Sequence, residues 1–141
     1  MRVRRLALAA TAAAALSAGL MAVAAPPADS AGTTSLVSLT LREWELTPAT
    51  VTARAGRVSF VVRNAGTMTH ELVVLRSDRH HHNLPVKGGK AVETGRVARI
   101  PAIPVGASKR LTLRMAPGRY VLLCNILGHY QAGQYAALRV R

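Results

Sequence analysis

The stretch Cys124-Asn125-Ile126-Leu127-Gly128-His129-Tyr130-Gln131-Ala132-Gly133-Gln134 contains the only cysteine of the chain and follows the pattern Cys-x4-His-x4-Gln. A thiolate, an imidazole and an amide oxygen on one short loop can face a single metal ion if the loop bends back on itself. A further donor has to come from elsewhere, and His70 stands 54 residues before Cys124, directly ahead of the apolar run 72–75. We therefore predict that His70, Cys124, His129 and Gln134 bind one metal ion.

Two imidazoles, one thiolate and a weak axial oxygen donor form the ligand set of a blue-copper electron-transfer centre. The soft thiolate stabilises Cu(I), while the imidazoles suit both oxidation states. Two alternatives stay open on the sequence alone. Zinc fits the same donors as a tetrahedral set, and the thioether of Met68, two residues before His70, competes with Gln134 for the axial position.

From about Leu36 to its end, the chain resembles the cupredoxin family, the plastocyanin- and azurin-like proteins with one type 1 copper. Three parts carry the resemblance: Val58-x-Phe60-x-Val62-x-Asn64-x-Gly66 leading to His70, Gly118-Arg119-Tyr120 leading to Cys124, and the loop 124–134. The family usually has methionine where Gln134 stands, and the glutamine makes the loop similar to that of the stellacyanin branch. The resemblance implies a copper site with an axial glutamine and a role in single-electron transfer.

Short segments of alternating apolar and polar residues, separated by turn residues such as Pro117-Gly118, run through the chain and predict β-strands. The candidate strands are residues 37–41, 51–53, 58–62, 71–76, 97–100, 109–113, 119–124 and 135–140. No segment has a convincing helical period. We predict an all-β fold, a Greek-key β-sandwich of seven to eight strands, because the contact between His70 and Cys124 is non-local. Alternation places Tyr120, Leu122 and Cys124 on the core face of one strand.

Residues 1–25 combine early arginines, an apolar run and small residues before Pro26, which predicts a secretory signal peptide. A membrane anchor is the alternative, because residues 6–25 form 20 mostly apolar positions. The pair Arg4-Arg5 leaves the export route undecided. We expect a flexible leader at 26–34 and one copper-binding domain at 35–141. The protein is then periplasmic, bound to the cell envelope or extracellular.

The predicted mature chain is strongly basic, with 16 Lys and Arg against 6 Asp and Glu, or a formal charge of +10, once Arg2, Arg4 and Arg5 are removed. An exported chain with one Trp, one Phe and no stacking motif is a poor nucleic-acid binder. Acidic redox proteins or anionic surfaces are better partners for this charge. We expect a monomer that contacts the membrane only if the N-terminal segment is retained.

Enzymatic activity is not expected, because strand alternation turns the Cys124 thiol inward and only His80-His81-His82 offer further copper ligands. The sequence favours an electron carrier that works through His129, surrounded by an apolar patch of Ile126, Leu127, Tyr130 and Ala132. The alternative is copper binding, delivery or storage. Geometry predicts that the histidine triplet lies far from the metal site, either as a solvated loop or as a weak second metal site. Candidates for hydrogen bonds that support the ligands are Asn64, Thr67, Glu71 and Asn125.

Overall fold

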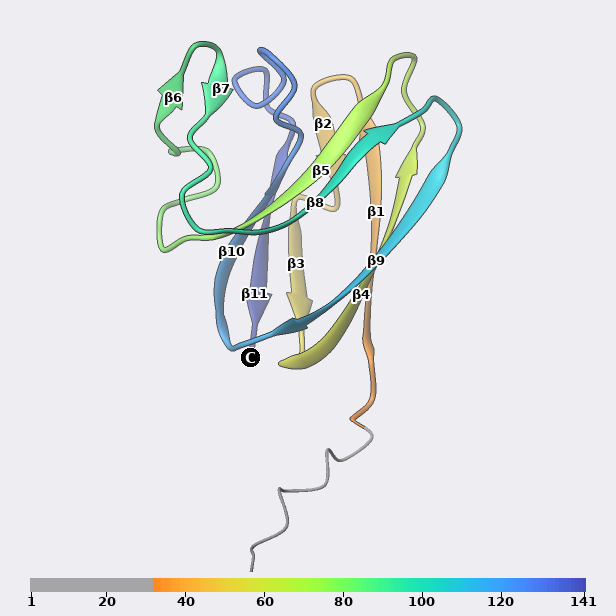
Figure 1. Cartoon of the computed structure of the whole chain (residues 1–141), viewed down its shortest axis with the longest axis vertical. Helices are drawn as coiled ribbons and strands as arrows, with labels where there is room; N and C mark the ends of the chain where they lie inside the picture. The colour runs from red at the N-terminus through yellow and green to blue at the C-terminus, as the bar shows by residue number, and fades with distance from the viewer. Residues whose placement is uncertain (1–31) are drawn as a thin grey trace, which may run out of the picture. The chain divides into compact units, whose positions relative to one another are not determined.

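The computed structural model describes residues 32–141, which form strands joined by turns and loops (Figure 1). The signal peptide and most of the leader predicted for residues 1–34 lie outside the described residues. Within residues 32–141, no helix is long and apolar enough to cross a membrane. The strands are β1 (Ser35–Arg42), β2 (Glu45–Thr47), β3 (Thr50–Ala53), β4 (Gly56–Asn64), β5 (His70–Arg76), β6 (Val86–Lys87), β7 (Lys90–Ala91), β8 (Arg96–Ile103), β9 (Ser108–Met115), β10 (Gly118–Leu123) and β11 (Tyr135–Val140).

Two sheets form the framework, one in the order β2-β1-β4-β9 and the other in the order β3-β11-β10-β5-β8. Strand β1 runs parallel to β4, and β11 runs parallel to β3, while the other neighbours in these sheets are antiparallel. The short hairpin β6-β7 forms a separate pair. All eight predicted strands are present, and the all-β sandwich is confirmed. Strands β2, β6 and β7 were not predicted, because two or three residues are too few to show an alternating pattern.

The main core lies between the two sheets and follows from strand alternation. Val37 and Leu39 of β1 pair with Phe60 and Val62 of β4, and all four side chains are buried. From the other sheet, Leu122 and its neighbours on the same face pack into this core. Tyr120 is buried there too and donates a hydrogen bond from its hydroxyl to the Ala116 carbonyl at 2.9 Å. Its burial confirms that Tyr120 lies on the core face of its strand.

A second, smaller core covers the opposite face of the β10-β5 pair. Val121 and Leu123 face away from the main core, as alternation predicts, and pack with Val73, Leu75, Leu84, Ala91 and Tyr130. The segment between β5 and β8 supplies Leu84 and Ala91, so it folds back over the sheet instead of pointing into solvent. Hydrogen bonds from the Gly128 N–H to the Gly89 carbonyl and from the Ala91 N–H to Asn125 join this segment to the loop 124–134.

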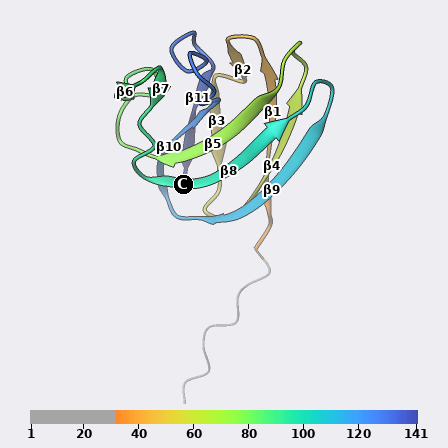
Figure 2. The same cartoon turned by 45° about the horizontal axis from the view of Figure 1, so that its top comes forward.

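Three connections meet at one end of the sandwich, at the top of Figures 1 and 2. They are the β1–β2 turn, the β4–β5 loop and the loop 124–134 between β10 and β11. The β6-β7 hairpin lies beside the last of these in both views. The side chains predicted to bind metal are placed at this end.

Candidate metal centre

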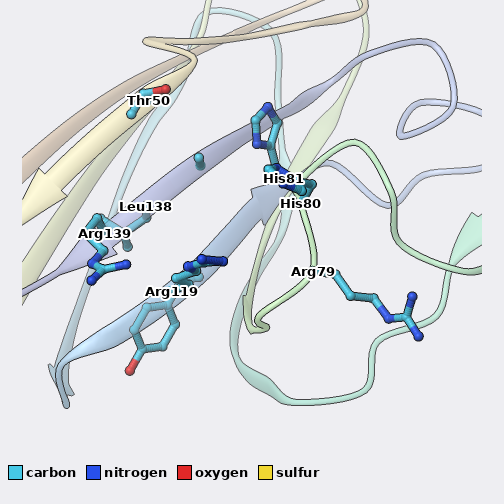
Figure 3. Close-up of a pocket in the computed structure, with 9 residues that line it drawn as sticks. Thr50, Arg79, His80, His81, Arg119, Leu138 and Arg139 are labelled. Atoms are coloured by element: carbon cyan, nitrogen blue, oxygen red, sulfur yellow. The ribbon is translucent and has the colours of Figure 1, made fainter.

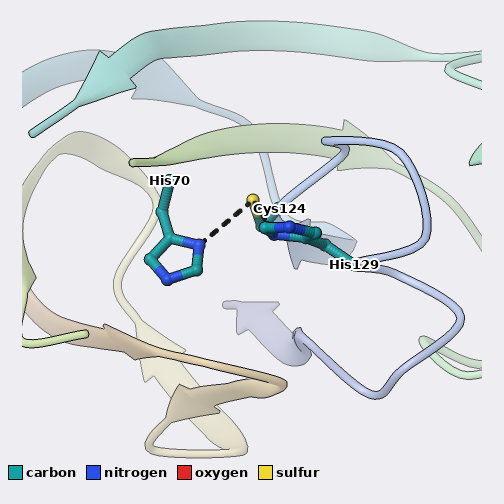
Figure 4. Close-up of side chains that lie close together, drawn as sticks. All are labelled: His70, Cys124 and His129. Atoms are coloured by element: carbon teal, nitrogen blue, oxygen red, sulfur yellow. Dashed lines mark hydrogen bonds between the residues drawn. The ribbon is translucent and has the colours of Figure 1, made fainter. Parts of the chain in front are cut away.

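His70, Cys124 and His129 come together at this end of the sandwich (Figure 4). One ligand atom from each lies within 4.8 Å of the other two. The Cys124 Sγ atom is 3.4 Å from His129 Nδ1 and 3.8 Å from His70 Nδ1. All three side chains are buried, with 0%, 0% and 5% exposure for His70, Cys124 and His129. The structure thus brings together three side chains that the sequence predicted as ligands.

Local structure explains this convergence. Cys124 directly follows β10 and continues its inward alternation, and His70 opens β5. The loop bends back because the Cys124 N–H donates to the Gln134 carbonyl at 3.0 Å and the Gln134 N–H donates to the His129 carbonyl at 3.1 Å. The β5–β8 pairing shifts register between His70 and Leu72, and the Glu71 N–H donates to Cys124 Sγ at 3.4 Å. A bulge beside the site therefore provides a backbone donor to the sulfur.

The Gln134 side chain is fully buried next to the two imidazoles. Its Oε1 atom is 2.9 Å from His129 Nδ1, and its Nε2 atom donates to the Arg42 carbonyl at 2.6 Å and lies 3.1 Å from His70 Nδ1. Because the Arg42 carbonyl needs a donor, this contact assigns Nε2 to that end of the amide, so Oε1 is the atom that faces His129. Met68, the competing candidate, is 40% exposed. This arrangement favours Gln134 over Met68 as a fourth donor, and the role of Gln134 stays a prediction.

The electrostatics of the cluster favour uncharged side chains. Burial raises the pKa of the Cys124 thiol, although hydrogen bonds from the Ile126 and Glu71 N–H groups oppose this effect. Burial likewise lowers the pKa of His70, against the opposing influence of Glu43. Thiolate and neutral imidazole are the forms that bind a metal ion. A bound cation would therefore compensate for the free-energy cost of burying the negatively charged thiolate. The donor set of one sulfur and two imidazole nitrogens therefore fits a soft or borderline transition-metal ion.

The predicted supporting residues act through specific hydrogen bonds. Asn64 holds the β4–β5 loop, since its Nδ2 donates to the carbonyls of Met68 and Ile103 and its Oδ1 accepts from the Gly66 N–H. Asn125 holds the loop 124–134 against residues 91–93, through both backbone groups of Ala91 and the carboxylate of Glu93.

For Glu71, the backbone N–H makes the contact with the site, while its carboxylate lies 3.6 Å from Arg99. The carboxylate that braces the ligand loop is instead that of Glu93, through Asn125. The other predicted supporting residue, Thr67, acts through its backbone N–H, which donates to Glu43 at 2.7 Å.

Sequence reasoning missed residues 42–44, the last residue of β1 and the β1–β2 turn, which close the remaining side of the site. Glu43 Oε1 is 3.2 Å from His70 Nε2 and also accepts from the backbone N–H groups of Thr67 and Met68. The Thr67 hydrogen bond is the main cause that lowers the pKa of Glu43 to about 2. The Trp44 ring meets the His129 ring edge-on, with 5.2 Å between centroids. No local pattern marks these residues, because their partners are 24 or more positions away along the chain.

The histidine triplet contributes no ligand to this cluster. The triplet lies in the segment between β5 and β8, which folds back over the sheet. The Tyr130 hydroxyl donates a hydrogen bond to the His81 carbonyl of this segment at 2.9 Å. His80 and His81 line a surface pocket of about 220 Å³ together with Arg79, Arg119 and Arg139 (Figure 3). The three arginines among the lining residues disfavour a second cation there.

The surroundings of His129 differ in part from the predicted patch. Leu127 is 65% exposed, but Tyr130 is buried in the smaller core and is therefore not part of a surface patch. Ala132 is exposed as predicted, and the large exposed apolar side chains on the three connections are Trp44, Met68 and Leu127. We call these three residues the apolar rim.

The comparisons with known proteins point to one fold. The sequence matches no protein-family model and no curated protein. The structure is similar to reduced auracyanin from Roseiflexus castenholzii, with a TM-score of 0.62 and 20% identity over 78% of this chain and 99% of the other. The chain has the cupredoxin fold. An azurin from Methylomonas sp. strain J (TM-score 0.58, 14% identity, 76% and 98% covered) and rusticyanin from Thiobacillus ferrooxidans (TM-score 0.57, 17% identity, 77% and 80% covered) are also similar.

Proposed function

We propose that this chain is an exported blue copper protein that carries single electrons between redox partners. The observation that carries the proposal is the buried cluster of His70, Cys124 and His129, within 4.8 Å of one another, at one end of a cupredoxin fold. Similarity to auracyanin, azurin and rusticyanin supports the same function. Export rests on the predicted signal peptide, residues 1–25.

In this proposal His70, Cys124 and His129 are the strong ligands and Gln134 is the weak axial one. Bound copper supplies a one-electron couple between Cu(II) and Cu(I). The chain contributes burial, which excludes water, and fixed side chains that need little rearrangement between the two states. The Glu71 N–H hydrogen bond to sulfur and the contacts of residues 42–44 hold the donors in place.

The test is the visible spectrum of the purified protein with one equivalent of Cu(II). We expect an intense band from thiolate-to-copper charge transfer and one copper per chain. Cys124→Ser should remove this band, because a hydroxyl does not replace the thiolate as a charge-transfer donor, while the matched surface variant His82→Ala should keep it. A colourless Cu(II) complex of the wild type, or a band that survives in Cys124→Ser, would contradict the proposal.

Docking is proposed to occur at the apolar rim. His129 is only 5% exposed, so a partner approaches its imidazole through Trp44, Met68 and Leu127. Three of the few acids, Glu43, Glu71 and Glu93, are engaged with His70 and with arginines at this end of the protein. These three carboxylates are paired with groups of the protein itself, so the excess of arginines and lysines makes the rest of the surface basic. A basic surface favours an acidic redox partner.

The alternative function is copper delivery or storage. Such proteins tend to bind Cu(I) with exposed methionines and histidines, whereas of the two methionines in residues 32–141 Met115 is buried in the main core. Voltammetry and a chelator assay separate the two functions. A reversible one-electron wave with copper retained supports the carrier, and rapid loss of copper to the chelator supports delivery.

A further inference from the structure

Residues 42–44 contact three of the four proposed ligands, His70, His129 and Gln134. The Arg42 carbonyl accepts a hydrogen bond from Gln134 Nε2 at 2.6 Å, Glu43 Oε1 lies 3.2 Å from His70 Nε2, and the Trp44 ring packs against His129. Three consecutive residues thus meet one side chain from β5 and two from the loop 124–134. Among these three contacts, the one made by Glu43 is the one that involves a formally charged group, its carboxylate.

The Glu43 carboxylate fixes the tautomer and the orientation of the His70 ring. An ionised carboxylate only accepts hydrogen bonds, so His70 Nε2 must carry the hydrogen that lies between them. In the neutral ring this leaves Nδ1 with its lone pair, and Nδ1 is the atom that faces Cys124 Sγ and Gln134. A carboxylate behind a ligating histidine orients the ring and increases its basicity as a ligand.

The carboxylate is itself held from the other side. The same Oε1 atom accepts from the Thr67 N–H at 2.7 Å and the Met68 N–H at 3.1 Å. These two donors lie in the loop that leads to His70, so Glu43 fixes both the imidazole and the backbone before it. The side chain remains 26% exposed, which means that the charge is not fully removed from water.

Gly66 provides the space for this carboxylate. A Cβ atom at position 66 would lie 2.4 Å from Glu43 Oε1 and 2.9 Å from its Cδ. Any larger residue would push the carboxylate away from its present position. Trp44, the next residue in the turn, has φ of 62°, a conformation that is rare for a bulky side chain. Strained backbone of this kind is concentrated at functional sites.

We propose that Glu43 is a positioning residue of the metal site, which orients His70 and lowers the reduction potential of the bound ion. The negative charge behind the ligating imidazole stabilises the more highly charged oxidation state. This inference rests on the proposed copper function. It concerns a hydrogen bond and a charge outside the set of ligands, so it can fail while the copper function stands.

The test compares Glu43→Gln with Glu45→Gln. Glutamine at position 43 keeps an oxygen acceptor for Thr67 and Met68 but removes the charge. Glu45 is exposed on β2 and makes no hydrogen bond or ion pair with His70, so Glu45→Gln makes the same charge change without altering the contact to the ligand. We expect Glu43→Gln to weaken Cu(II) and Co(II) affinity, measured by chelator competition, by about 10- to 100-fold. A loss of Cu(II) affinity tenfold greater than that of Cu(I) raises the potential by about 59 mV. Glu45→Gln should change either quantity less than twofold.

Gly66→Ala separates position from charge. It displaces the carboxylate but retains its charge, so we expect weaker Co(II) binding and an altered ligand-field spectrum with a smaller rise in potential than in Glu43→Gln. Thermal unfolding of the metal-free variants, followed by circular dichroism, checks the fold.

The outcomes are distinct. Equal potentials and affinities in Glu43→Gln and Glu45→Gln, with a blue wild type, would overturn the role of Glu43. A lower unfolding midpoint in Glu43→Gln with the potential and affinity of the wild type would reduce Glu43 to a purely structural residue, which also overturns the proposal. A wild type without the charge-transfer band would instead refute the copper function.

Discussion

Gln134→Met tests whether the glutamine is the axial ligand and what its amide contributes to the fold. An amide oxygen is a harder donor than a thioether sulfur and favours Cu(II), so the substitution should raise the reduction potential. Each tenfold loss of Cu(II) affinity relative to Cu(I) corresponds to a rise of about 59 mV. Voltammetry of the copper form measures this shift directly.

The same substitution should also destabilise the metal-free protein. Gln134 is fully buried, and methionine cannot donate the hydrogen bond that Nε2 makes to the Arg42 carbonyl at 2.6 Å. Loss of one partner of a buried hydrogen bond costs about 1–3 kcal/mol. For a domain of this size each kcal/mol lowers the unfolding midpoint by roughly 4–8 °C. We expect a fall of that order in a thermal melt followed by circular dichroism.

Two control variants sharpen the experiment. Gln131→Met makes the same change at an exposed position of the same loop and should leave both potential and midpoint unchanged. Met68→Leu removes the competing thioether and should also leave the potential unchanged. If Gln134→Met retains the colour but not the rise in potential, Gln134 is not a ligand. If Met68→Leu alters the potential instead, Met68 holds the axial position.

Two further predictions concern the segment between β5 and β8. Asn125→Ala removes three hydrogen bonds that join the ligand loop to residues 91–93, so it should lower the free energy of unfolding by about 3 kcal/mol in urea titrations, while Asn83→Ala, at an exposed position, should have little effect. Equal stability of the two variants would refute this role. Replacement of His80, His81 and His82 by Ala should leave the charge-transfer band and potential unchanged and remove at most a weak second Cu(II) or Zn(II) binding event; loss of the band, with the fold intact, would mean that the triplet provides a ligand.

The parts of the site that the sequence predicted are those with a local signal. Cys124, His129 and Gln134 lie on one loop at fixed spacing, and Cys124 directly follows a strand whose alternation turns the sulfur inward. His70 could be found because it closes a turn motif and opens an apolar strand. The β-sandwich followed from alternation in the same way, and the strands that were missed are the very short ones.

The remaining contacts have no local signal, because they join residues that only the folded sheets bring together. Gln134 and the Arg42 carbonyl are separated by 92 positions, and Glu43 and His70 by 27. The parallel pairing of β1 with β4 places Leu41 beside Asn64, so the end of β1 lies next to the loop that leads to His70. A turn of two residues after β1 is then sufficient to bring Glu43 and Trp44 over the imidazoles. The sheet register, rather than any motif, therefore determines which acid of this basic chain lies behind a ligand.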